Sequence, residues 1–350
     1  MGGGGDANPA GSDSGSDSGS GSDAITSTLR EKTITIAGPV TGTLTDFPLW
    51  ISLTDSDLAA RARADGTDIY FVAGTTQLDF QIQSWTKTTG RLDAWVRVPS
   101  LATNTTLAMR YGDVATAHAP DAPGTFAGYA AVWHLDDSLS STAVADARNL
   151  TNGTASMLST TDSVAARLGN GINFTDGNDQ IAFTNPLSGS GPHTISVWIN
   201  QRTTTTNDAI IALGNGSLNE ARWFHSRYNV ATIAVGFYTN DYTNPATDII
   251  GDGWTLLHWV YEGTNRMTRI YRDGALVAGP FQHAAGVNTQ GNSGVLGNAP
   301  GPFGTNMGIN AALDEIRIIA VARSPEWIAA EFANQQTAST FYSVSTEHMP

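Results

Sequence analysis

Apolar and polar residues alternate along much of the chain, which is the pattern of strands with one buried side and one solvent-facing side. In the segment 77–83, Leu78, Phe80 and Ile82 occupy every second position between polar residues. The segment 91–98 repeats this alternation. Because an amphipathic helix would place apolar residues three or four positions apart, we predict strands in both segments.

Turn-forming residues divide these predicted strands into short units. Asp65-Gly66 is one such turn signal. Short alternating strands separated by turns favour an antiparallel sandwich, and we predict one over residues 25–116. A stretch with two prolines follows and is predicted to be a linker, at residues 117–126.

The alternating pattern restarts after the linker and continues over residues 127–345. Its predicted strands are short, are separated by glycine, and do not alternate with helices as a parallel nucleotide-binding sheet requires. One convincing helix lies near the end, where Ser324 is placed as N-cap, Pro325 as first-turn residue and Trp327 on an apolar face. The predicted fold class is therefore all-β, with two consecutive antiparallel β-sandwich or jelly-roll domains after an N-terminal tail.

Four segments of the first predicted domain resemble the bacterial domain of unknown function numbered 2341 (DUF2341). They read TLTDFPLWISLTDSDLAARARADGTDIYFV, LDFQIQSW, GRLDAWVRVPSL and TLAMRYGD. The resemblance covers most of this domain. It implies an exported protein with several domains and names no activity.

The second predicted domain resembles the laminin-G-like, concanavalin A-like jelly roll of bacterial extracellular proteins. The matching segments occur in the family's order and read AVWHLDD, VADARNLTNGT, GNGINFTDGNDQIAF, HTISVWIN, GWTLLHWVYEG, RIYRDGALVAG and LDEIRIIAVARSPEWIAAEF. Together they cover roughly residues 130–335. The resemblance implies two stacked antiparallel sheets, in agreement with the alternating pattern.

The beginning of the chain is of a different character. Residues 2–23 are almost wholly Gly, Ser and Asp and include no aliphatic residue larger than alanine. Such a segment cannot bury enough apolar surface to offset the entropy of ordering it, so we predict a flexible tether over residues 1–24. The segment resembles the stretch that follows the lipidated cysteine of bacterial lipoproteins, with an engineered spacer as the alternative. This resemblance implies an extracellular or cell-surface location, including that of an outer-membrane lipoprotein.

Charge and composition narrow the classes of partner. The 350 residues include 18 Lys and Arg against 32 Asp and Glu, a net charge of −14, which opposes binding to nucleic acid or to an anionic membrane. The chain has no cysteine, which excludes disulfides, thiolate metal sites and thiol nucleophiles. No apolar run reaches the roughly 18 residues of a spanning helix, so we predict no transmembrane segment.

Calcium is the cofactor implied by the second resemblance. Family members often hold a structural calcium ion between the loop that opens the domain and the closing strand, which here correspond to Asp146, Asn149, Asn152 and Asp314. Hard oxygen ligands of this kind suit calcium. Arg148 departs from the family's loop pattern, because it brings a positive charge to the site. The alternative is that the loop side chains cap turns.

The sequence contains none of the short motifs that mark common enzymes. It has no G-x-S-x-G, no H-E-x-x-H and no phosphate-binding G-x-x-x-x-G-K, and its histidines are scattered. Pairs of carboxylates for glycoside cleavage cannot be ranked from sequence. The candidate acids are Asp136, Asp137, Glu262, Asp314 and Glu315. We predict no catalytic residue and keep a glycan-cleaving enzyme as the minor alternative.

A mixture of aromatic and polar residues marks the segment 219–244. Sugar rings present apolar CH faces that stack on aromatic rings, while nearby amides and carboxylates bond the sugar hydroxyls. We therefore predict a site for an extracellular glycan or surface polymer, with the contact residues Trp223, Tyr228, Tyr242, Asn240 and Asp241.

Two hypotheses about function remain in competition. The leading hypothesis is a cell-surface recognition or adhesion protein whose second domain binds carbohydrate or another extracellular ligand, assisted by calcium. The other is a structural spacer, or a subunit of a surface assembly, which self-associates or contacts a protein partner and has no small-molecule site. A concave aromatic patch would favour the first, and an exposed sheet edge or apolar interface the second. Two acids facing each other in a groove would favour a hydrolase.

Overall fold

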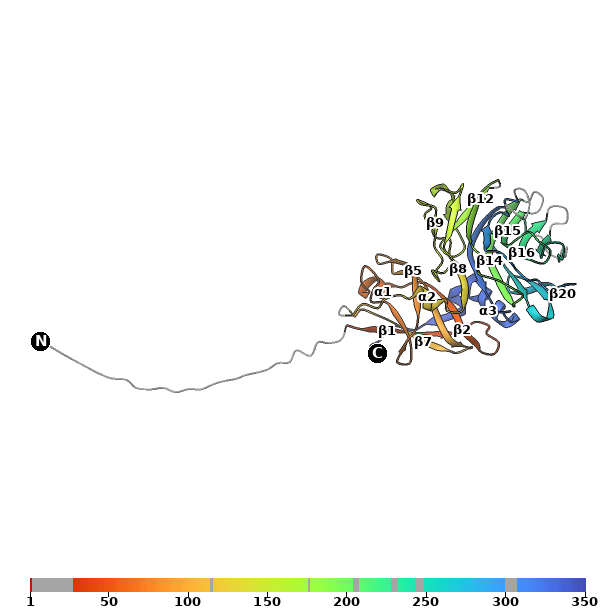
Figure 1. Ribbon diagram of the computed structural model, residues 1–350. Coiled ribbons are helices and arrows are strands. Elements are labelled where there is room, and N and C mark those ends of the chain that lie inside the picture. Colours follow the sequence, from red (N-terminus) through yellow and green to blue (C-terminus); the bar gives the residue numbers. More distant parts are fainter. Residues whose placement is uncertain are drawn as a thin grey trace.

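The computed structural model describes residues 1, 28–113, 116–175, 177–203, 208–227, 232–242, 249–299 and 307–350. The predicted tether falls almost entirely outside these residues. In Figure 1 two β-rich units lie side by side, with β8, α2 and α3 near their junction, and the C-terminus lies beside the first unit. All strand pairings that the structure describes are antiparallel, which confirms the predicted all-β class.

The first unit is a sandwich of two sheets. Its five-stranded sheet has the strand order β23 (Tyr342–Val344), β1 (Arg30–Ile36), β7 (Thr106–Tyr111), β3 (Tyr70–Ala73) and β4 (Thr76–Gln77). Its three-stranded sheet has the order β2 (Leu44–Thr54), β6 (Arg91–Leu101) and β5 (Phe80–Thr86).

Strand β6 shows how the alternating pattern forms this core. Leu92, Ala94 and Val96 are fully buried, as the alternation in segment 91–98 predicts. Trp95 has the opposite parity, but it is buried as well. The centre of its ring lies 4.6 Å from that of Trp50 on the paired strand β2, with the two rings tilted by 41°, and the second unit covers both rings.

The second unit is a jelly roll with a larger core between two sheets. One sheet has the order β17 (Thr232–Gly236), β16 (Ala221–Arg227), β15 (Asp208–Gly214), β21 (Ser293–Leu296), β13 (Gln180–Thr184), β10 (Gly153–Ser156) and β9 (Ala143–Val144). The other has the order β11 (Ser163–Ala165), β12 (Asn170–Thr175), β22 (Asn310–Ile319), β14 (His193–Thr203), β18 (Thr255–Tyr261), β19 (Met267–Arg272) and β20 (Ala275–Gln282), with β8 (Tyr129–Trp133) also paired to β22.

Helices are few and short in the described residues. They are α1 (Ser56–Arg61), α2 (Ala122–Thr125), α3 (Pro325–Gln336) and α4 (Ala338–Phe341), with 3₁₀ turns at Thr160–Asp162 and Gly263–Asn265. Helix α3 begins as the sequence predicts, because the Ser324 hydroxyl accepts a hydrogen bond from the Trp327 N–H at 3.3 Å and Pro325 follows the cap. None of these helices is long and apolar enough to cross a membrane.

The C-terminal segment returns to the first unit after completing the second. Strand β23 pairs with β1 in the register Ile34 to Val344. The carbonyl of Phe341 accepts hydrogen bonds from the N–H groups of Ala37 and Gly38, and its ring stacks on Phe47. The sequence predicts residues up to 345 as part of the second domain, whereas these last residues complete a sheet and a core of the first.

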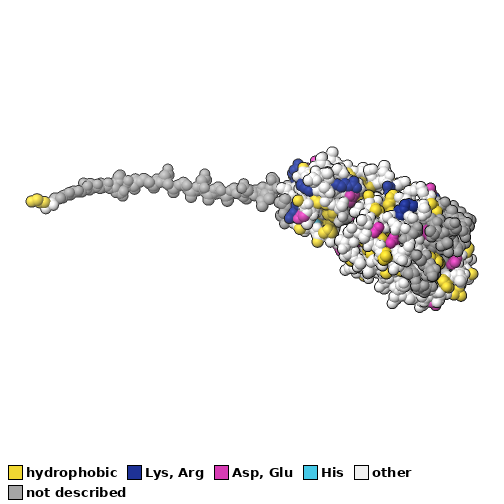
Figure 2. Space-filling model, turned by 90° about the horizontal axis from the view of Figure 1, so that it is seen from above, with side chains coloured by type: hydrophobic (Ala, Val, Ile, Leu, Met, Phe, Trp, Pro, Cys, Tyr) yellow, Lys and Arg dark blue, Asp and Glu magenta, His cyan; other side chains and the backbone are white. Residues whose placement is uncertain are grey.

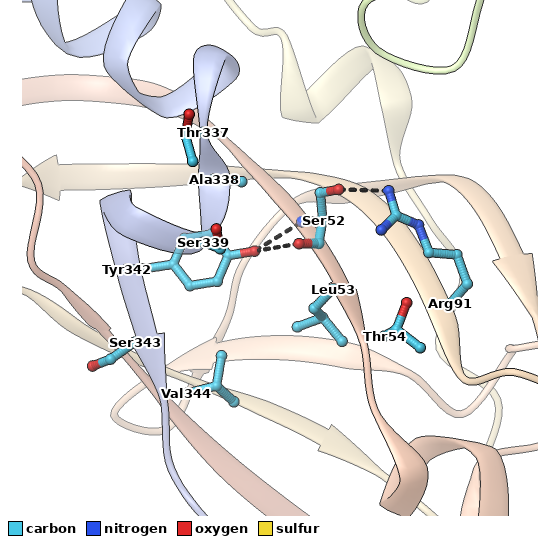
Figure 3. Close-up of a pocket in the computed structure, with 10 residues that line it drawn as sticks. All are labelled: Ser52, Leu53, Thr54, Arg91, Thr337, Ala338, Ser339, Tyr342, Ser343 and Val344. Carbon is cyan, nitrogen blue, oxygen red and sulfur yellow. Dashed lines mark hydrogen bonds between the residues drawn. The ribbon is translucent and has the colours of Figure 1, made fainter. Parts of the chain in front are cut away.

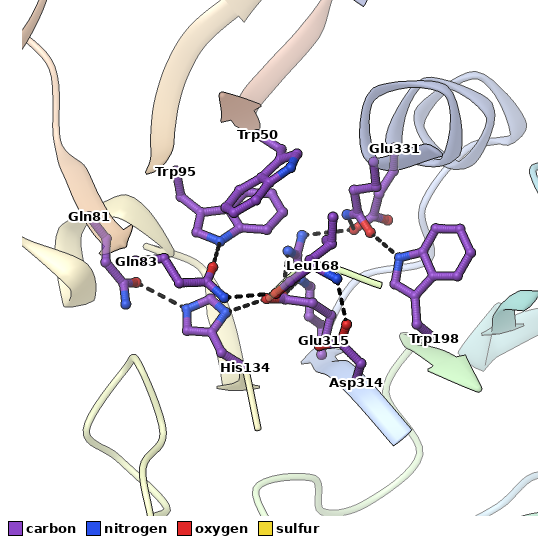
Figure 4. Close-up of polar contacts among 12 residues, drawn as sticks. Trp50, Gln81, Gln83, Trp95, His134, Leu168, Trp198, Asp314, Glu315 and Glu331 are labelled. Atoms are coloured by element: carbon purple, nitrogen blue, oxygen red, sulfur yellow. Dashed lines mark hydrogen bonds and ion pairs between the residues drawn. The ribbon is translucent and has the colours of Figure 1, made fainter. Parts of the chain in front are cut away.

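The two units share a buried network of charges. Arg317 of β22 lies between Glu315 and Glu331, at 2.8 Å and 2.9 Å, and all three side chains are almost fully buried. The guanidinium of Arg317 also lies 4.2 Å from the ring centre of Trp95 in the first unit. His134 pairs with Glu315 at 2.6 Å (Figure 4). One cation of the jelly roll thus compensates two buried acids and packs on the first unit.

Acid should weaken this network through Glu331. Burial opposes ionisation of Glu331, but the hydrogen bond and charge of His258 and the charge of Arg317 outweigh it and lower its pKa to about 2. A lowered pKa adds stability above the unfolded value of about 4.3 and loses it as the pH falls toward 2. We expect the free energy of unfolding to drop by roughly 3 kcal/mol over this interval. Urea titrations of the wild type and of Glu331→Gln check this, because the variant should lack this part of the drop.

Candidate functional site

A cleft beside the C-terminal end of α3 brings aromatic and polar side chains together. We call it the aromatic cleft. It has a volume of about 210 Å³ and is lined by Arg167, Trp198, Trp254, Asp273, Phe332 and Gln336. These residues come from the loop before β12, from β14, from the start of β18, from the turn after β19 and from α3. Five separate elements of the jelly roll and its following helix therefore build one site.

The floor of the aromatic cleft is held rigidly. Trp198 is buried, and its indole N–H donates a 2.6 Å hydrogen bond to Gln335 of α3. The centre of the Phe332 ring lies 6.0 Å from the centre of the Trp198 ring. The guanidinium of Arg167 lies 5.0 Å from the centre of the Trp198 ring and donates a hydrogen bond to the Gln336 carbonyl. The floor is thus set by α3 and the outer face of β14.

The rim of the cleft offers groups that a ligand can reach. Trp254 and Asp273 are each half-buried. One oxygen of Asp273 accepts the N–H of Leu256 at 2.9 Å, which fixes the turn. An indole face and a carboxylate thus lie on one rim, and this combination suits stacking and hydroxyl recognition.

The charges in the aromatic cleft are close to balance. Burial lowers the pKa of Arg167, and the charges of Asp314 and Asp273 act in the opposite direction. The Nε of Arg167 is buried and has no hydrogen-bond partner among the described residues. Asp314 lies on the strand position paired with Trp198, and burial together with the charge of Glu315 raises its pKa well above its usual range. A site with one guanidinium beside one accessible carboxyl group, Asp273, favours a neutral ligand.

The residues predicted to hold calcium do not form one oxygen shell. Each oxygen of Asp146 accepts two backbone N–H groups, at 2.8 to 3.0 Å, from residues 132, 148, 150 and 151. The Asn152 side-chain oxygen accepts the N–H of Asp146, and its amide donates to Asn149. Asp314 instead accepts the N–H of Leu168. No group of three or more metal-binding His, Asp or Glu side chains occurs in the described residues. These four residues therefore do not fit a shared calcium ion, and calcium binding by the chain stays a prediction.

Asp146 holds its loop by accepting hydrogen bonds from N–H groups. Its replacement should therefore destabilise the fold whether or not a metal ion is present. We expect Asp146→Ala to lower the free energy of unfolding by about 2 kcal/mol, because buried N–H groups lose their acceptor. The loss should be equal in calcium and in EDTA. Thermal and urea unfolding in both conditions measure it. A loss of stability seen only in the calcium-containing buffer would instead support a calcium site at Asp146.

The predicted glycan-contact residues do not form one platform. Tyr242 is buried, and its ring stacks on Phe281 at 4.2 Å, so it belongs to the core. Asn240 is held by Asn219 and the carbonyl of Ala285, while Asp241 accepts the N–H of Phe237. Trp223 is half-buried on β16 and stacks on His225. Tyr228 lies outside the described residues.

Trp254 lines the aromatic cleft, although it is not among the contact residues predicted from the sequence. A signal was present in its spacing from Trp259. Residues five positions apart in a strand point to opposite faces, and Trp259 is fully buried in the jelly-roll core. Trp254 therefore belongs to the outer face, where α3 covers the sheet.

A second cleft of about 260 Å³ lies between the two units, and we call it the interdomain cleft. Gln81 and Gln83 line it from β5, and His134, Asp136 and Asp137 line it from the segment after β8. Burial raises the pKa of Asp136 to about 6, against the hydrogen bond from the Asn170 N–H. Burial also raises the pKa of Asp137. Of the five acids left unranked by the sequence, these two share a cleft.

Charged side chains form no broad basic surface on the described part of the face shown in Figure 2. Lys and Arg occur there in small, separate groups.

Solved structures give several distant likenesses. Domain 4 of AbnA, an extracellular arabinanase from Geobacillus stearothermophilus solved in complex with arabinotriose, is 18% identical, with a TM-score of 0.45; the match covers 59% of this chain and 98% of that domain. Trypanosoma rangeli sialidase in complex with 2,3-difluorosialic acid is 10% identical, with a TM-score of 0.47, covering 75% of this chain and 44% of the sialidase. The binding domain of Paraclostridial Mosquitocidal Protein 1 is 14% identical, with a TM-score of 0.42, covering 59% and 51%. This chain thus spans less than half of the sialidase.

Family models match two consecutive segments of the chain, whereas no curated protein matches it. The domain of unknown function DUF2341 matches residues 65–142. The concanavalin A-like lectin/glucanases superfamily matches residues 175–329. The chain therefore carries a DUF2341 domain followed by a laminin-G-like, concanavalin A-like domain, in the order that its sequence predicts.

Proposed function

We propose that this chain is an extracellular recognition protein that binds a neutral carbohydrate in the aromatic cleft of its concanavalin A-like domain. The observation that carries the proposal is the arrangement of Trp254, Phe332, Arg167 and Asp273 around one cavity of about 210 Å³. The rings offer apolar faces for sugar CH groups, and the guanidinium and carboxylate can bond sugar hydroxyls. The extracellular location is part of the proposal and is supported by the acidic Gly/Ser-rich segment 2–23.

The size and charge of the cleft define the ligand further. A cavity of this size accommodates about one sugar ring, because ligand pockets for whole drug-sized molecules start at about 300 Å³. Arg167 and Asp273 oppose each other in charge, so a carboxylated or sulfated sugar would leave one charge uncompensated. The chain's net charge of −14 also disfavours acidic polymers. A terminal or side-branch ring of a neutral glycan fits best.

A glycan array with the purified chain tests this proposal. The array should contain neutral and acidic glycans, and the expected hits are neutral glycans that share one exposed ring type. Hits limited to acidic glycans would contradict the assignment of the cleft. The absence of any saturable hit would favour the structural spacer or assembly subunit.

One observation favours glycan cleavage as a second candidate function. Asp136 has a raised pKa and lies beside Asp137 in the interdomain cleft, a setting in which a carboxyl group can act as a general acid. Release of reducing ends from array hits tests it, with Asp136→Asn as the variant. Equal release by the wild type and this variant would exclude Asp136 from such a reaction.

A further inference from the structure

The free edge of strand β2 is covered by side chains where a neighbouring strand would lie. The N–H of Trp50 donates to the side-chain oxygen of Asn334 at 2.7 Å, and the Asn334 amide donates back to the Trp50 carbonyl at 3.0 Å. Two residues along, the hydroxyl of Tyr342 accepts the Ser52 N–H at 2.8 Å and donates to the Ser52 carbonyl at 3.1 Å. Four hydrogen bonds from the C-terminal segment thus replace those of an adjacent strand.

This edge continues for one more outward-facing residue. The N–H of Asp55 donates toward β6, to the Gly90 carbonyl, so odd-numbered residues face the partner strand and even-numbered residues face outward. Thr54 therefore directs its backbone N–H and C=O to the same side as Trp50 and Ser52. Among the described residues no strand lies beyond β2 on this side.

Strand β23 has a matching open edge. The N–H of Ser345 donates to the carbonyl of Thr33, which makes this a hydrogen-bonded pair and places the preceding residue, Val344, at a non-hydrogen-bonded position. Val344 therefore directs its backbone groups away from β1. Within the described part of the chain, β23 is the last strand of its sheet.

A cavity of about 540 Å³ lies where these two edges meet (Figure 3). We call it the edge slot. It is larger than either of the other two clefts. Its lining includes the outward-facing residues Thr54 and Val344 together with the side chains of Ser52, Leu53, Ser339 and Ser343. Hydroxyl groups, the Leu53 side chain and unpaired strand edges therefore face one space.

We infer that the edge slot binds a short, extended, uncharged peptide that pairs with these strand edges. Exposed N–H and C=O groups on a strand edge are templates for a further strand. Asn334 and Tyr342 bond to Trp50 and Ser52, which are two residues apart as the bonding positions for an added strand would be. Thr54, the next such position, lies in the slot. The one guanidinium at the slot, that of Arg91, is bound by both oxygens of Asp93, so an acidic side chain is not required. The one aromatic ring in the lining, that of Tyr342, is buried and its hydroxyl is bonded to Ser52, which disfavours stacking of a sugar.

Selection from a phage-displayed library of random heptapeptides on the full chain tests this inference. An enriched peptide is synthesised, and its Kd is measured by fluorescence anisotropy. Val344→Pro removes the outward N–H but leaves the bonds to β1, and we expect a Kd about fivefold to tenfold higher. Val344→Ala keeps the backbone groups and is the matched control, with a Kd close to that of the wild type.

A second variant tests the inference even if Val344→Pro does not fold. Ser339 is exposed on α4, and Ser339→Trp places a large side chain in the slot while the sequence of both strands stays unchanged. We expect it to abolish peptide binding while the melting temperature stays near that of the wild type. Equal binding to this folded variant would overturn the inference, and so would a selection that enriches no peptide.

Discussion

Replacing Arg317 with alanine is expected to lower the free energy of unfolding by about 3–5 kcal/mol. The variant leaves Glu315 and Glu331 buried without the cation that lies within 3 Å of both. It also removes the guanidinium that packs on Trp95 in the DUF2341 domain. Because Trp95 lies at the shared boundary, its fluorescence should report the change. Urea unfolding followed by tryptophan fluorescence measures the effect.

Arg63→Ala is the matched control for this change. Arg63 forms a surface pair with Asp65, both side chains are substantially exposed, and such pairs contribute about 1 kcal/mol or less. A triple variant with Arg317→Met, Glu315→Gln and Glu331→Gln separates unpaired charge from lost packing. It should recover most of the stability, because no buried charge remains uncompensated. A loss in Arg317→Ala no larger than in the control would contradict this role.

Replacing Trp254 with alanine is expected to weaken glycan binding about 10- to 100-fold. The indole supplies the main accessible aromatic face of the cleft, since Trp198 is buried beneath Arg167. Loss of such a stacking surface costs about 1.5–3 kcal/mol. Isothermal titration with the best array glycan measures the change in Kd.

Trp85→Ala provides the control for Trp254. Trp85 is also a half-buried tryptophan, but it lies on β5 of the DUF2341 domain, with its N–H bonded to the Arg63 carbonyl. Its loss should leave the glycan Kd unchanged. If both variants bind as the wild type does, the aromatic cleft is not the glycan site.

The strand framework could be predicted because it depends on local alternation. Leu92, Ala94 and Val96 are buried as their spacing indicates, and Ser324 caps α3 as its position before Pro325 indicates. Each inference required only neighbouring residues, a period of two and a capping preference.

Contacts between segments far apart in the sequence could not be predicted from these local patterns. Arg317 meets Trp95 across more than two hundred residues, and β23 pairs with β1 across almost the whole chain. Tyr242 was placed at the predicted site because aromatic residues gather near it in sequence, yet its ring faces Phe281 in the core. Asp146 has the residue type of a calcium ligand, but four local N–H groups use its oxygens. Composition identifies such groups, whereas only the fold decides what they contact.

The most direct test of glycan binding in the aromatic cleft is a crystal structure of the chain with its best array glycan. We expect one neutral sugar ring packed against Trp254, with hydroxyls bonded by Arg167 and Asp273. A ring bound instead on β16 beside Trp223, or in the interdomain cleft beside Asp136, would contradict it.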